Sequence, residues 1–142
     1  MKPIKIIYKL LVSIGVMMFF SYASCDKWVC GDNWFVNKTV HKIHVNVYCH
    51  GEVNNELSFL ITPNDSINRI TCGWGGPVDP FTSNTCGSDS ILVVFNDTLP
   101  LNTFKYLEYN PMNLKVLSKT KFRYEFTEAH YQKALEVNGY SR

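Results

Sequence analysis

Apolar and polar residues alternate along much of this chain, and the alternation predicts short β-strands. In residues 42–49 the odd positions are apolar and the even positions are polar, as in a strand with one buried face and one wet face. Residues 57–61 alternate in the same way, and residues 91–95 form a continuous apolar run typical of a central strand covered on both sides. The remaining predicted strands are residues 33–36, 66–72, 114–117 and 121–126.

One helix is predicted near the C-terminal end. Thr127 is a good N-cap, and Glu128 follows it in the first turn, where the helix dipole favours an acid. Gly139 is a natural helix stop. The apolar stripe of this helix comprises Tyr131, Ala134 and Leu135.

The order of these elements predicts an all-β fold. We expect an antiparallel β-sandwich of six or seven strands, immunoglobulin-like or transthyretin-like in size, over residues 34–142, with one short C-terminal helix. An α+β sheet with the helix on one face is the alternative. The Gly- and Pro-rich residues 73–88 are predicted to be a long loop without regular structure.

The first 24 residues have the layout of a secretory signal peptide. Basic residues come first, an uncharged and mostly apolar run occupies residues 10–20, and small or polar residues follow. This run is shorter than the roughly 17–25 apolar residues of a spanning helix. An uncleaved anchor reaching back to Ile4 is the alternative, but it would place Lys5 and Lys9 inside the span.

The charge of residues 25–142 argues against nucleic acid as a partner. Residues 25–142 carry 11 Lys and Arg against 12 Asp and Glu, so the basic excess of the whole chain lies in the leader. No basic cluster with interleaved aromatic residues is present in this part of the sequence, and we therefore expect no binding to nucleic acid.

Cys25 differs from the other four cysteines by its position. It follows the apolar run directly after residues 22–24, Tyr-Ala-Ser, and this resembles a bacterial lipoprotein cleavage box. In such a box the Cys becomes the mature N-terminus and carries acyl chains such as palmitate. We favour lipidation of Cys25, with residues 25–33 as a lipid-anchored tether to the membrane. A plain signal peptide, with Cys25 free or disulfide-bonded, is the alternative.

The other four cysteines are expected to form disulfides. Cys30, Cys49, Cys72 and Cys86 allow three pairings, which sequence alone does not separate. Proximity favours Cys72–Cys86, which leaves Cys30–Cys49. Their spacing does not match a structural zinc site, so disulfides in an oxidising compartment are the better interpretation.

No catalytic, metal or cofactor site is predicted. His41 and His44 would point to opposite faces of a strand, and His44 and His50 would lie about 20 Å apart along it. We expect surface histidines there, and His130 is expected to be exposed on the helix. The acids are scattered and no nucleophile motif occurs, so an enzyme is not expected.

Trp74 is the most suggestive residue for ligand binding. It lies among glycines in the predicted loop, with Phe81 nearby, and a flat, stiff ring offers a large contact area to a sugar or a partner protein. Trp74 and Phe81 are therefore the candidate ligand-binding residues. The competing interpretation, which we favour from sequence, is that Trp74 folds back onto the sandwich core.

Three Asn-x-Ser/Thr triplets begin at Asn37, Asn64 and Asn96. In a secreted eukaryotic protein they would be glycan acceptors, whereas in a bacterial lipoprotein they are only turn residues.

Several segments together resemble a known group of proteins. They are the leader ending in Cys25-Asp-Lys-Trp, residues 37–45, residues 90–99 and the Phe122-Arg-Tyr-Glu-Phe-Thr127 run into the helix. This pattern is similar to the small uncharacterised envelope lipoproteins of Bacteroides-type bacteria. The resemblance implies a non-enzymatic cell-envelope protein, in the outer membrane or facing the periplasm, and it does not cover the CGWGG sequence around Trp74.

The sequence leaves three possible functions, from different classes. The first expectation is a lipid-anchored envelope protein that serves as a binding or structural module. The alternative is a plainly secreted, disulfide-stapled protein, with glycans at Asn37, Asn64 or Asn96, that binds a glycan or protein through the Trp74 loop. The third is a hydrolase with a site assembled from distant residues.

Overall fold

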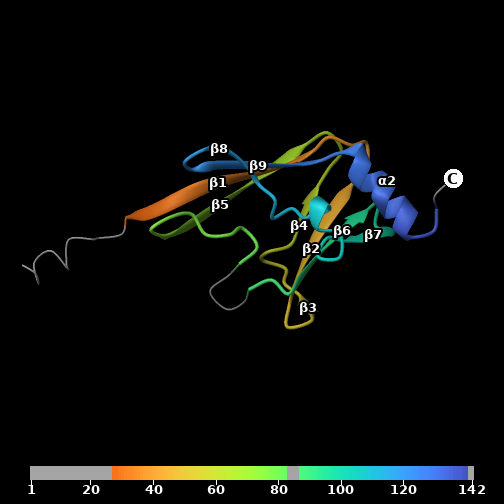
Figure 1. Ribbon diagram of the computed structural model, residues 1–142, viewed down its shortest axis with the longest axis horizontal. Helices are drawn as coiled ribbons and strands as arrows, with labels where there is room; N and C mark the ends of the chain where they lie inside the picture. The colour runs from red at the N-terminus through yellow and green to blue at the C-terminus, as the bar shows by residue number, and fades with distance from the viewer. Residues whose placement is uncertain (1–26, 83–86, 141–142) are drawn as a thin grey trace, which may run out of the picture.

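The computed structural model describes residues 27–82 and 87–140, which form two β-sheets and one C-terminal α-helix (Figure 1). Sheet A has the strand order β5-β1-β9-β8. Sheet B has the order β3-β2-β6-β7, and β4 also pairs with β2. The elements are β1 (Trp28–Asn37), β2 (Ile43–Cys49), β3 (Glu52–Val53), β4 (Phe59–Ile61), β5 (Ser66–Trp74), β6 (Ser90–Phe95), β7 (Leu99–Asn102), the 3-10 helix η1 (Leu107–Tyr109), β8 (Lys115–Ser118), β9 (Lys121–Phe126) and α2 (Glu128–Val137).

The predicted sandwich-like, mostly β architecture is confirmed, but sheet A is mixed. β1 pairs antiparallel with β5 on one side and parallel with β9 on the other. The prediction of a wholly antiparallel sandwich is therefore wrong for this one pair. Alternation along a strand identifies its buried face but carries no information about the direction of the neighbouring strand.

The core lies between the inner faces of the two sheets. In sheet B the apolar positions of β2 and β6 face each other in register, with Ile43 opposite Phe95 and Val45 opposite Val93. All four side chains are buried, as the alternation predicts. Sheet A contributes Phe35 and other buried residues to the same core.

Helix α2 begins and ends where the sequence predicts. Thr127 is the N-cap residue, and Gly139, with a φ of +81°, follows the last turn. The Tyr131 ring contacts Phe95 of sheet B edge-on, with ring centroids 5.6 Å apart. Asn138 Nδ2 donates a hydrogen bond of 2.8 Å to the Pro100 carbonyl, which attaches the end of the helix to β7.

Strand β7 is not among the strands predicted from the sequence, and it contains Pro100. β7 pairs with β6 alone, and a proline is tolerated at such an edge because its missing N–H need not take part in the ladder. The preceding turn places Asn96 and Asp97 at positive φ, which these residue types tolerate better than most.

Strands β1 and β5 are longer than predicted. β1 begins at Trp28 rather than Asn33, so most of the expected tether is part of the sheet, and β5 continues through Gly73 to Trp74. Figure 1 shows β1 and β5 reaching past the strands of sheet B, with the following segment folded back along them. Gly73 therefore did not prevent strand formation, because the pairing with β1 continues through it.

The chain after β5 covers the inner face of this extension. A Cβ atom on Gly31 would lie 2.6 Å from Pro77 Cβ, and a Cβ on Gly73 would lie 2.5 Å from Val78 Cγ2. Both glycines are buried, and only residues without side chains fit between the strands and the loop at this distance. The loop is thus fixed on the core side of sheet A.

Phe81 ends this loop in the core and does not reach solvent. Its ring is 0% exposed, with its centroid 5.3 Å from that of Phe35 and 6.2 Å from that of Phe59. The interpretation of Phe81 as a ligand-binding residue is therefore wrong. The sequence pointed to Phe81 because it is an aromatic residue in a predicted loop, but the loop places its ring in the core.

We expect Phe81→Ala to lower the free energy of unfolding by about 3–5 kcal/mol, because it removes a fully buried ring and leaves a cavity. Phe104, which is 38% exposed, supplies the control, and Phe104→Ala should change the free energy by less than about 1 kcal/mol. Urea denaturation of the two variants measures both values. Equal losses in the two variants would contradict the placement of Phe81 in the core.

Candidate functional site

All three tryptophans of the chain lie on the outer face of sheet A. Trp28 and Trp74 are directly opposite each other across the β1–β5 pair, with ring centroids 5.4 Å apart in an edge-to-face arrangement. Trp34 lies on the same face of β1, six residues further along. We call this surface the tryptophan face, and it comprises Trp28, Cys30, Asp32 and Trp34 of β1 and Asn68, Ile70, Cys72 and Trp74 of β5.

The rings on this face are open to solvent. Trp28 is 58% exposed, Trp34 is 40% exposed and Trp74 is 73% exposed, while Ile70 between them is 65% exposed. Large apolar residues gathered on one exposed surface are typical of an interaction site, whereas single exposed residues need no explanation. The tryptophan face is therefore the candidate binding surface.

Trp74 does not fold onto the core, so the interpretation that the sequence favoured is wrong. Successive strand residues point to opposite faces, and the inner position beside it is occupied by Gly73. The loop carrying Pro77 and Val78 lies against that inner position. Trp74 consequently projects from the other face of the sheet, which this loop leaves uncovered.

A disulfide joins Cys30 and Cys72 in the middle of the tryptophan face. The two residues are opposite each other across β1 and β5, and each lies two positions from a tryptophan of the Trp28–Trp74 pair. The crosslink closes a sequence separation of 42 residues. In the chain-entropy model, a loop of this length stabilises the fold by about 4 kcal/mol.

This crosslink overturns the expected pairings. Cys72–Cys86 and Cys30–Cys49 are both wrong, because strand pairing brings Cys30 to Cys72 although other cysteines are nearer in sequence. The prediction that Cys30 and Cys72 form disulfides is confirmed, and Cys49 is disulfide-bonded as well. Cys86 lies outside the described residues, as do Cys25 and the predicted signal peptide. A disulfide indicates an extracytoplasmic location.

Polar side chains flank Trp34 on both sides. Its cross-strand neighbours are Asn68 on β5 and Arg123 on β9. Within the residues that the structure covers, Asn68 Oδ1 and Arg123 Nε have no hydrogen-bond partner. Asn68 Nδ2 lies 3.4 Å from Asp32 Oδ1, so a carboxylate, an amide and a guanidinium surround this ring.

His130 is buried rather than exposed, and it belongs to a hydrogen-bond chain. The Thr127 N–H lies 3.1 Å from Nδ1, and Nε2 lies 2.7 Å from the Tyr124 hydroxyl. Nδ1 therefore accepts, the Nε2–H donates to Tyr124, and the Tyr124 hydroxyl donates to the Tyr109 carbonyl at 2.8 Å. Burial lowers the pKa of His130 to about 4 and raises that of Tyr124. This chain ties α2 to β9 and η1.

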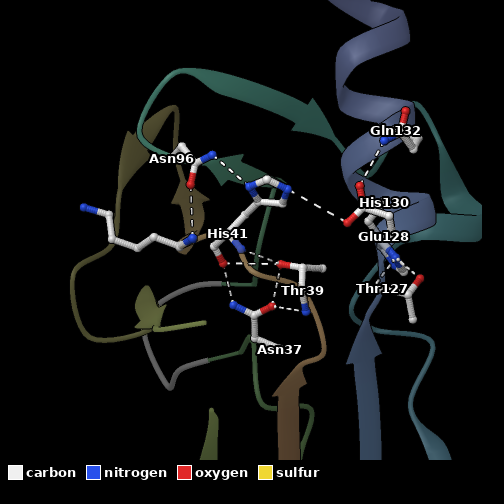
Figure 2. Close-up of polar contacts among 9 residues, drawn as sticks. Asn37, Thr39, His41, Asn96, Thr127, Glu128, His130 and Gln132 are labelled. Carbon is white, nitrogen blue, oxygen red and sulfur yellow. Dashed lines mark hydrogen bonds and ion pairs between the residues drawn. The ribbon is translucent and has the colours of Figure 1, made fainter. Parts of the chain in front are cut away.

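A second polar cluster attaches the start of α2 to the turn after β1 (Figure 2). Asn96 Nδ2 donates to His41 Nδ1 at 3.0 Å, and the other ring nitrogen faces a Glu128 carboxylate oxygen at 3.9 Å. The His41 ring also stacks on Tyr131, with centroids 3.6 Å apart. His41 lies between β1 of sheet A and β2 of sheet B, and it therefore attaches this connection to α2. It does not meet His44, which lies 2.9 Å from Asp97.

A cleft of about 430 Å³ lies beside β8 and β9, and it contains two glutamates. Its lining residues are Glu108, Asn113, Lys115, Leu117, Arg123, Tyr124, Glu125 and His130. Lys38 and Arg123 each lie 2.8 Å from Glu125, and the Lys38 hydrogen bond holds the pKa of that carboxyl below its ordinary value. A general acid needs a raised pKa, whereas the pKa of Glu125 is lowered. Both ring nitrogens of His130 are already hydrogen-bonded.

The three Asn-x-Ser/Thr triplets have different accessibility. Asn37 is buried, and its Nδ2 donates to the carbonyls of His41 at 2.7 Å and Thr62 at 3.0 Å. A glycan on this nitrogen is incompatible with the fold, so Asn37 is not an acceptor in the folded protein. Asn64 and Asn96 are exposed turn residues.

Two further findings concern the described residues 27–82 and 87–140. They contain no group of three or more His, Cys, Asp and Glu side chains arranged to hold a metal ion. No helix among them is both long enough and apolar enough to span a bilayer.

We expect stability to fall as the pH drops from about 6.5 to 4. In this window the unfolded chain, with a His130 pKa near 6.5, binds a proton that the folded chain, with a pKa near 4, does not. Complete passage through the window costs about 3 kcal/mol from this residue. Urea denaturation at several pH values measures the loss, and His130→Gln should reduce the slope between pH 6.5 and 4. An unchanged slope in that variant would contradict this account.

Comparison of the chain with protein-family models, with curated proteins and with solved structures finds no match in any of the three.

Proposed function

We propose that this chain is an exported, lipid-anchored envelope protein that acts as a non-enzymatic binding module, with a glycan as the ligand of the tryptophan face. The observation that carries the proposal is the gathering of Trp28, Trp34 and Trp74 on one exposed sheet face. Leaving a large apolar side chain in solvent forgoes about 1.5–3 kcal/mol of burial free energy. A ligand that covers these rings recovers part of it.

The shape and composition of this face favour a glycan over a protein partner. The face is part of a sheet rather than a cavity, and polar side chains are interspersed with the rings, including Asp32 and Asn68. Sugar rings offer an apolar face for stacking and hydroxyl groups for such side chains. A protein partner that buries Ile70 and the tryptophans is the alternative outcome of the binding test below.

The binding surface is rigid, which supports recognition without chemistry. The β1–β5 ladder and the Cys30–Cys72 disulfide hold the rings in place, so little conformational freedom is lost on binding. The cleft at Glu125 and His130 supports a hydrolase less well. Glu125 is ion-paired, and His130 is held neutral in a hydrogen-bond chain.

The cellular location of the protein is also part of the proposal. The disulfide supports export, and the layout of residues 1–25 supports a signal peptide followed by a lipid-bearing Cys25. An outer-membrane or periplasm-facing position, and kinship with Bacteroides-type envelope lipoproteins, accord with this layout. For the fold, an immunoglobulin-like or transthyretin-like sandwich is proposed, with the parallel β1–β9 pair as a departure in sheet A. A plainly secreted protein with glycans at Asn64 or Asn96 is the alternative.

Intact-mass measurement of the protein from its native envelope tests the anchor. We expect a mature chain that starts at Cys25 and carries extra mass from acyl chains and glycerol. Cys25→Ser should abolish this mass and release the protein from the membrane fraction. A retained leader, a mass with hexose additions instead, or an unmodified N-terminus would contradict lipid anchoring.

A glycan array tests the binding surface. We expect Trp34→Ala and Trp74→Ala each to weaken glycan retention by about tenfold or more, since loss of a central aromatic contact costs more than about 1.4 kcal/mol. Their melting temperatures should stay close to that of the parent protein because both rings are exposed.

Tyr140→Ala is the matched control, because Tyr140 is an exposed aromatic residue outside the tryptophan face. It should leave glycan retention unchanged. Equal retention by all variants, or capture of proteins but no glycans, would overturn the proposal. A sharp fall in melting temperature for Trp74→Ala would show that its ring supports the fold.

A further inference from the structure

The tryptophan face has two aromatic platforms rather than one. The first is the Trp28–Trp74 pair at the end of β1 and β5, and the second is Trp34. Six residues separate Trp28 from Trp34 along β1, which corresponds to about 20 Å in an extended strand. Both platforms lie on the same face because an even number of residues separates them.

The surface between the platforms is fixed and carries hydrogen-bonding groups. The Cys30–Cys72 disulfide lies beside the first platform, and Asp32 follows on β1. At the second platform, Asn68 Oδ1 and Arg123 Nε are buried atoms that have no hydrogen-bond partner among the described residues. One is an acceptor and the other is a donor, so rotation of these side chains toward a ligand would satisfy them with hydroxyl groups.

The charged residue of the tryptophan face is an acid, which disfavours an anionic ligand on β1. Arg123 Nη2 and Lys38 Nζ each lie 2.8 Å from the Glu125 carboxylate, so the guanidinium already has an anionic partner, which it shares with Lys38. Asp32 lies between the two platforms and would repel a carboxylate or sulfate group. A neutral ligand meets neither obstacle.

We infer that the ligand is a neutral, linear glycan that lies along β1 and stacks on both platforms at once. This inference rests on the proposed function and adds the ligand's charge, its direction and its minimum length. The right-handed twist of the strands rotates the two platforms relative to each other, so the bound chain follows a gradual turn. Engagement of the second platform is intramolecular once the first is occupied, and it therefore raises affinity steeply.

The test measures affinity against oligosaccharide length by isothermal titration calorimetry. The probes are ladders of linear β-glucan, α-glucan, xylan and mannan oligosaccharides, from disaccharides to octasaccharides, added to the full mature chain. We expect one ladder to bind weakly when short and about 10²-fold more tightly once its members span about 20 Å. A sulfated or uronic-acid ladder of the same lengths should bind more weakly.

Single-platform variants separate this inference from the proposed function. Trp34→Ala and Trp28→Ala should each remove the length-dependent increase and leave the weak binding of short oligosaccharides, whereas Tyr140→Ala should preserve the increase. If some ladder binds but affinity does not rise with length, the two-platform inference fails and the proposed binding function stands. If no neutral ladder binds, both fail.

A second measurement covers the case in which Trp34→Ala is unstable. In the Trp28→Phe/Trp74→Phe variant both platforms keep aromatic rings and Trp34 is the single tryptophan. Long oligosaccharides should protect its fluorescence from acrylamide quenching. Binding without protection of Trp34 would overturn the inference.

Discussion

The structure depends on the antiparallel pairing of β1 with β5. Nine residue pairs run from Trp28–Trp74 to Val36–Ser66, and the Cys30–Cys72 crosslink fixes their register. A shift of one residue would turn every side chain of a strand to the opposite face. The tryptophans would then face the loop and the core, and the buried Phe35 would face solvent. Register is therefore the constraint that creates both the core and the exposed surface.

The inner side of the β1–β5 pair has two glycines, which leave space for a loop. Gly31 and Gly73 have no side chains, and Pro77 and Val78 fill the space beside them. This contact holds the start of the loop against the sheet, and the same loop then delivers Phe81 to the core. Because the loop occupies one side, the bulky rings of Trp28 and Trp74 are accommodated on the other. Core packing and surface exposure are thus two consequences of one arrangement.

His130 and His41 serve the fold. His130 connects Thr127 and Tyr124, and His41 connects Asn96 to the start of α2. At His130 the partners occupy both ring nitrogens and define the tautomer, whereas at His41 Nδ1 is hydrogen-bonded and Nε2 faces Glu128 at 3.9 Å. Such polar networks specify how the helix sits on the two sheets. The exposed tryptophans, in contrast, have no comparable structural role, and this difference is why we place function on the tryptophan face.

The sequence determined the local elements of this protein. Alternation identified β2 and β9 with nearly correct bounds, and a continuous apolar run identified β6. Thr127 and Gly139 marked the ends of α2, because all of these signals act between residues close in the chain. The sequence also drew attention to Trp74 as a ligand-binding residue. It did not include Trp28 and Trp34, although their spacing of six residues places both on one face of any strand that contains them.

The tertiary structure decided everything that depends on residues distant in the chain. It paired Cys30 with Cys72 rather than with a nearer cysteine, made β1 parallel to β9, buried Phe81 and His130, and exposed Trp74. None of these outcomes follows from a local pattern, because each is set by which strands become neighbours and which face a loop covers. The three tryptophans form one surface only because β5 returns beside β1, and that pairing is a property of the whole fold.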